Sequence, residues 1–174
     1  LYRAAMQAES RQEFMDRMRL AVAKYEGAKE SYGKLGELGR KPRMLRCDAM
    51  ISYEGYWLSK EVLEKKNLID ACWRLTKECL KAFEEAEDAW EYGKTFNQLS
   101  MNALFGFFLE WNVQTREKTL KEATEQGEQA ITFLSTFKDP SELARAYAKT
   151  VVLGEVFALY FQDLDERQSS DRKL

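Results

Sequence analysis

The sequence of 174 residues contains no histidine. This absence excludes histidine-based catalytic triads, histidine metal sites and histidine pH switches. The sequence also lacks the motifs of phosphate-binding loops, dinucleotide-binding turns, serine hydrolases and zinc metalloproteases. No pair of carboxylates stands out as a general acid and a general base. We therefore expect a protein that is not an enzyme, with no catalytic residues, no metal site and no cofactor.

Cysteine is scarce as well. The three cysteines, Cys47, Cys72 and Cys79, are an odd number and show no CxxC spacing. Cys72 and Cys79 lie seven residues apart, about two helical turns, which is too far for a disulfide within one straight helix. We expect all three to be buried, reduced thiols in a cytoplasmic protein.

Long apolar runs are missing. The most apolar stretch, Phe105 to Leu109, is closed by Glu110 and is far shorter than the roughly 18 residues of a membrane-spanning helix. No signal sequence opens the chain. The 27 basic and 29 acidic residues give a net charge of −2, so nothing attracts the chain generally to nucleic acid or anionic lipid. We expect neither as a partner. The start without methionine predicts a piece of a longer chain.

Proline occurs only twice, in a composition rich in alanine, leucine, glutamate, lysine and arginine. These residues favour helices, and no segment alternates apolar with polar residues as a strand would. Possible capping boxes at Ser10–Glu13 and Asp139–Glu142 mark two helix starts. The fold class predicted is all-α with about six helices. Their expected ranges are 10–35, 42–60, 66–87, 90–111, 116–137 and 140–167.

The sequence repeats its own pattern at a spacing of 51 residues. Glu37, Asp88 and Asp139 follow one another at this spacing, and the segment GYWL at 55–58 overlays GFFL at 106–109. We therefore predict a single helical-repeat domain over 1–174, built from antiparallel helical hairpins. Its units are 10–60, 61–111 and 112–167, with 1–9 as the remnant of a preceding helix and 168–174 as a tail.

Small and aromatic residues in the first predicted helix carry a resemblance to a known family. Ala21, Tyr25 and Ala28 have the small–aromatic–small spacing found in the second helix of a tetratricopeptide repeat (TPR). The chain resembles TPR proteins, as a variant with longer helices. This resemblance implies hairpins stacked as a right-handed solenoid and a protein-binding scaffold. The scaffold would use a concave face lined by the first helix of each pair.

Cations recur at the same spacing of 51 residues, as Arg43, Lys94 and Arg145. Further cations and an asparagine lie in the neighbouring rows. In a concave groove, such side chains would suit an acidic peptide or a C-terminal carboxylate, because they donate charge-assisted hydrogen bonds. The predicted partner-binding residues are Arg43, Arg46, Lys94, Asn97, Arg145 and Lys149.

Other interpretations of these features remain open at this stage. The cations could be solvated first-turn residues paired with Glu91, Glu142 or other nearby acids. The aromatic residues, 13% of the chain, could pack the core or form a ligand-facing wall around Tyr53, Tyr56 and Trp57. The alternative function is a ligand-sensing, regulatory or dimerisation segment of a larger signalling protein. Self-association through exposed repeat ends is a further possibility.

Overall fold

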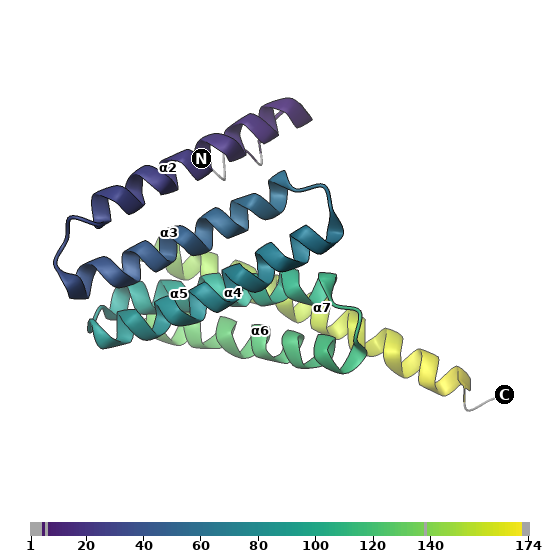
Figure 1. Ribbon diagram of the computed structural model, residues 1–174. Helices are drawn as coiled ribbons and strands as arrows, with labels where there is room; N and C mark the ends of the chain where they lie inside the picture. Colours follow the sequence, from purple (N-terminus) through teal and green to yellow (C-terminus); the bar gives the residue numbers. More distant parts are fainter. Residues whose placement is uncertain (1–4, 6, 138, 172–174) are drawn as a thin grey trace.

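The protein is described by a computed structural model over residue 5, residues 7–137 and residues 139–171 (Figure 1). In this part of the chain the regular elements are all α-helices, and each helix packs mainly on the next one in sequence. The predicted all-α class is therefore confirmed. The helices are α2 (Arg11–Tyr32), α3 (Glu37–Leu58), α4 (Val62–Glu85), α5 (Ala89–Leu109), α6 (Val113–Leu134) and α7 (Pro140–Asp171).

The helix boundaries follow the spacing of 51 residues seen in the sequence. Helix α5 ends at Leu109, 51 positions after α3 ends at Leu58. Helix α6 begins at Val113, 51 positions after α4 begins at Val62. The α3–α4 and α5–α6 hairpins thus keep the same register, and α7 starts one further period after α5. Unlike α3 and α5, α7 does not end at the equivalent position 160 but continues to Asp171.

Two predicted helix caps are present. The Ser10 hydroxyl accepts a hydrogen bond from the backbone N–H of Glu13 at 3.1 Å. The Asp139 carboxylate accepts hydrogen bonds from the backbone N–H groups of Ser141 at 2.9 Å and Glu142 at 3.3 Å. Each cap satisfies N–H groups that have no partner inside the first helical turn.

Several predicted boundaries are wrong by a few residues. Helices α3, α4 and α6 begin earlier than the expected positions 42, 66 and 116. Pro42 lies inside α3, because the helix already starts at Glu37. Gly36 is its N-cap, and the Gly36 carbonyl accepts the N–H of Arg40 at 2.9 Å. Residues 168–171 belong to α7 and not to a tail, and 7–10 form a turn before α2. The rest of the predicted leading remnant lies largely outside the described residues.

The core consists of apolar clusters between successive helices. Cys47, Cys72 and Cys79 are all buried and form no disulfide, as the sequence predicted. Burial raises the pKa of Cys72 to about 12 and that of Cys79 to about 11, so both thiols stay protonated at neutral pH. The Cys79 thiol donates a hydrogen bond to the carbonyl of Pro42 at 3.3 Å. These cysteines pack α4 against its neighbours.

Close packing of α6 on α7 requires a glycine at position 127. A Cβ atom there would lie 2.8 Å from Oγ1 of Thr150 and 3.4 Å from Cδ1 of Leu153. The Thr150 hydroxyl is held by a hydrogen bond to the carbonyl of Ala146 at 2.9 Å, so it resists moving aside. We expect Gly127→Val to lower the free energy of unfolding by about 1–3 kcal/mol in urea denaturation. The control is Gly27→Val, where no atom lies within 4 Å of the new Cβ. Equal stability of the two variants would argue against the close contact.

Candidate functional site

A groove of about 700 Å³ lies across α3, α5 and α7. Tyr25 of α2 and Thr76 and Cys79 of α4 complete its lining. The other residues that line it are Arg46, Ala49, Met50, Tyr53, Lys94, Thr95, Asn97, Gln98, Met101, Glu142, Arg145, Ala148 and Lys149.

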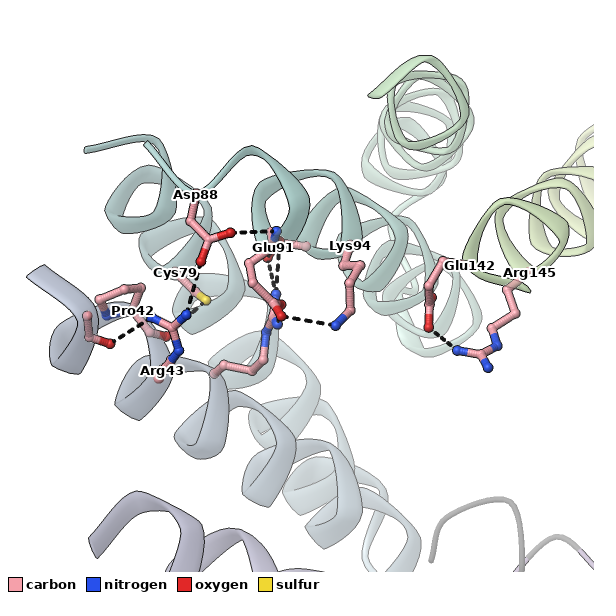
Figure 2. A network of polar contacts seen from close by, with 11 residues as sticks. Pro42, Arg43, Cys79, Asp88, Glu91, Lys94, Glu142 and Arg145 are labelled. Carbon is pink, nitrogen blue, oxygen red and sulfur yellow. Dashed lines mark hydrogen bonds and ion pairs between the residues drawn. The ribbon is translucent and has the colours of Figure 1, made fainter. Parts of the chain in front are cut away.

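The groove brings together five of the six predicted partner-binding residues, namely Arg46, Lys94, Asn97, Arg145 and Lys149. Arg43 lies outside its lining. The Arg43 guanidinium donates hydrogen bonds to the Asp88 carboxylate at 3.0 Å and to the backbone carbonyl of Gly39 at 3.2 Å (Figure 2). It therefore ties α3 to the start of α5 beside the groove.

Arg46 is held firmly at the boundary between α3 and α5. Its guanidinium pairs with the Glu91 carboxylate and donates hydrogen bonds to the Glu91 carbonyl at 3.0 Å and to the Thr95 hydroxyl. The same guanidinium lies 4.7 Å from the centroid of the Phe83 ring, a cation–π contact. These contacts fix the position of one positive charge in the groove.

Lys94 and Arg145 each pair with an acid on their own helix (Figure 2). The Lys94 ammonium lies 3.1 Å from Oε1 of Glu91, and Arg145 pairs with Glu142. Burial alone would raise the pKa of Glu91, but the nearby Arg46 and Lys94 outweigh it and hold that pKa below its usual value. The carboxylate therefore stays ionised. These are the pairs that the alternative interpretation of the cations expected.

The ion pairs neutralise only part of the charge. Arg46, Lys94 and Arg145 are three cations, whereas Glu91 and Glu142 are the two acids paired with them, which leaves an excess of one positive charge among these five residues. The Lys149 ammonium also donates to the backbone carbonyl of Asn97 at 3.4 Å. These groove residues therefore carry a net positive charge, with cations contributed by α3, α5 and α7.

Asn97 contributes a polar group of a different kind. Its side chain lines the groove although the residue is only 4% exposed. Among the described residues, no group hydrogen-bonds its carboxamide. No carboxamide atom of Asn97 is among the fully buried polar atoms without a partner, so the carboxamide is accessible from the groove. A ligand in the groove can therefore accept a hydrogen bond from this amide.

Part of the groove lining is apolar. Met50 and Tyr53 of α3 face the same groove as Met101 of α5. Of the predicted aromatic wall, only Tyr53 lines the groove, and Tyr53, Tyr56 and Trp57 all belong to one apolar cluster of α3, α4 and α5. Sequence reasoning missed the two methionines, although they lie one period of 51 residues apart and the repeat could have revealed them.

Within the described ranges, no group of three or more cysteine, aspartate or glutamate residues is placed to hold a metal ion. None of the helices in this part of the chain is long and apolar enough to cross a bilayer. No protein-family model, no curated protein and no solved structure matches the chain.

Proposed function

We propose that this chain is a protein–protein interaction scaffold that binds an acidic peptide segment in the groove across α3, α5 and α7. The observation that carries the proposal is the excess of positive charge beside the Asn97 carboxamide, which has no hydrogen-bond partner among the described residues. Carboxylates bind most strongly where cationic and amide donors converge. The resemblance to TPR proteins supports the same role, since such scaffolds bind peptides along the first helices of their hairpins.

The division of the groove suggests the chemistry of the peptide. A carboxylate would accept hydrogen bonds from Asn97, Lys94 and Arg145. The acids that now pair with Lys94 and Arg145 lie on the same helices as these cations and are partly exposed to solvent. An adjacent apolar side chain would contact Met50 and Met101. Methionines adapt their shape to different partners, which suits a groove that accepts more than one apolar residue.

We expect Lys94→Gln combined with Arg145→Gln to weaken binding of an acidic peptide by at least about tenfold, because hydrogen bonds to charged groups contribute about 1.5–3 kcal/mol each. The probe is a set of fluorescein-labelled octapeptides that contain aspartate or glutamate next to leucine or methionine. Binding is measured by fluorescence anisotropy, at low and at physiological salt. It should weaken as salt rises, since partly exposed charges are screened.

Two controls separate the groove from general electrostatics. Arg43→Gln removes a cation outside the groove lining and should change peptide affinity little, although it also removes one positive charge. Peptides with asparagine and glutamine in place of the acids should bind at least tenfold more weakly. Equal affinity for acidic and amide peptides would contradict the proposal, and so would unchanged binding in the Lys94 and Arg145 variant.

A further inference from the structure

Helix α7 exposes an apolar stripe along one face. Tyr147, Val151, Gly154 and Ala158 follow each other at helical spacing and are exposed, with Tyr147 at 52% and Val151 at 60%. A Cβ atom at Gly154 would have no atom within 4 Å. We call these four residues the open face of α7. Leu159 lies beside this face and is also exposed.

The repeat shows what kind of element covers this face elsewhere in the chain. One period of 51 residues earlier, the equivalent residues of α5 are Phe96, Ser100, Ala103 and Phe107, and all four are buried. Helix α6, the antiparallel partner of α5, contributes to covering them. The Phe96 ring stacks on Phe133 of α6 at a centroid distance of 5.7 Å. Ala103 and Phe107 share a core cluster with Leu120 and Ala123 of α6.

Helix α7 has no such partner within the described residues. The turn between α5 and α6 lies at 110–112, and the equivalent positions of α7 are 161–163. There the chain does not turn back but continues as helix to Asp171, as Figure 1 shows for the yellow end of the chain. Residues 161–171 therefore extend α7 past the open face and do not fold over it as α6 folds over α5.

We propose that the open face of α7 binds the same face of a second copy of this chain, in an antiparallel α7–α7 pair. A two-fold axis perpendicular to a helix makes the helix antiparallel to its own copy. This is the orientation that α5 and α6 adopt in the hairpin. Helix α7 of a second copy can therefore lie on the open face in the antiparallel orientation.

The open face is complementary to itself in size. With the two-fold axis between residues 152 and 153, Tyr147 of one copy lies opposite Ala158 of the other. In the same register Val151 lies opposite Gly154. Each large side chain thus meets a small residue, which permits the close helix packing that Gly127 permits between α6 and α7. This inference does not depend on peptide binding, because none of the four residues lines the groove.

Sedimentation velocity over a series of protein concentrations tests the pair. We expect a species of twice the 20.3 kDa chain mass that dissociates on dilution. Val151→Glu should raise the dimer Kd at least tenfold, because the pair would then bury a charge. The control, Leu63→Glu, alters a residue of α4 that is 71% exposed and should leave the dimer intact. Circular dichroism of both variants checks that the helices remain.

A second measurement does not depend on the glutamate variant. Val151→Cys together with Gly154→Cys should form disulfide-linked dimers on mild oxidation, whereas Val62→Cys with Leu63→Cys at the start of α4 should not. The three native thiols are buried and give no background. A chain that stays monomeric at all concentrations would overturn the inference. A dimer whose Kd is unchanged by Val151→Glu would also overturn it. Growth in mass beyond the dimer would show end-to-end stacking in place of a two-fold pair.

Discussion

Replacement of Glu54 by glutamine is expected to raise the free energy of unfolding by about 3 kcal/mol at pH 8 and to change it little at pH 4. Glu54 lies on α3 and is fully buried, and neither of its carboxylate oxygens has a hydrogen-bond partner among the residues that the structure describes. Burial raises its pKa from 4.5 to about 7. The folded protein therefore holds a proton that the unfolded chain releases more readily.

The direction of the pH dependence follows from this raised pKa. Below pH 4.5 the carboxyl is protonated in both states and costs nothing electrostatically. Between pH 4.5 and about 7 the unfolded chain ionises while the folded protein does not, so stability falls as pH rises. Above about pH 7 the loss is complete. Glutamine has nearly the same shape and carries no proton to lose, so the loss should disappear in the variant.

Urea denaturation of both proteins from pH 4 to pH 8 measures the difference. The control is Glu30→Gln, a change of the same kind at an exposed position of α2, which should not alter the pH dependence. The pKa of the Tyr25 hydroxyl is an independent probe of the charge on Glu54, because this pKa is raised first by burial and then by that charge. If wild type and Glu54→Gln lose stability in parallel over this range, Glu54 is not the titrating group.

Replacement of Phe83 by alanine is expected to lower the free energy of unfolding by about 3–5 kcal/mol. Phe83 is fully buried near the end of α4. Its ring also lies under two cations, 4.7 Å from the Arg46 guanidinium and 5.8 Å from that of Arg43. The substitution therefore leaves a cavity and removes the surface on which Arg46 rests at the edge of the groove.

The same variant connects the core to the groove. Urea denaturation measures the loss of stability, and Phe83→Leu should recover a large part of it because the cavity is smaller. Phe108→Ala removes an exposed phenylalanine and should cost much less. A loss below about 1 kcal/mol for Phe83→Ala would contradict this account of the α4 core.

The helical fold was predictable because its signals are local. Helix formers, two caps and the spacing of 51 residues lie in the sequence itself, and they indicate which cations recur from unit to unit. The start of α3 was mispredicted because a proline such as Pro42 usually marks a first turn, whereas α3 already begins at Glu37, directly after its N-cap Gly36.

The site was only partly predictable because it depends on how helices cross. Arg43 and Lys94 occupy equivalent positions in the repeat. Arg43, however, pairs with Asp88 and lies outside the groove lining. Tyr25 and Thr76 line it from α2 and α4, although the six predicted binding residues all lie on α3, α5 and α7. Neither the choice of ion-pair partner nor these contributions follow from the spacing along the chain.

Contact mainly between successive helices has a consequence for the kinetics of folding. Residues that meet in the native structure lie mostly within one or two helices of each other along the chain, so little loop entropy is lost before contacts form. A fold of this kind forms quickly, and a hairpin such as α5–α6 can gain structure before its neighbours do. The groove, which needs α3, α5 and α7 together, is then among the last features to assemble.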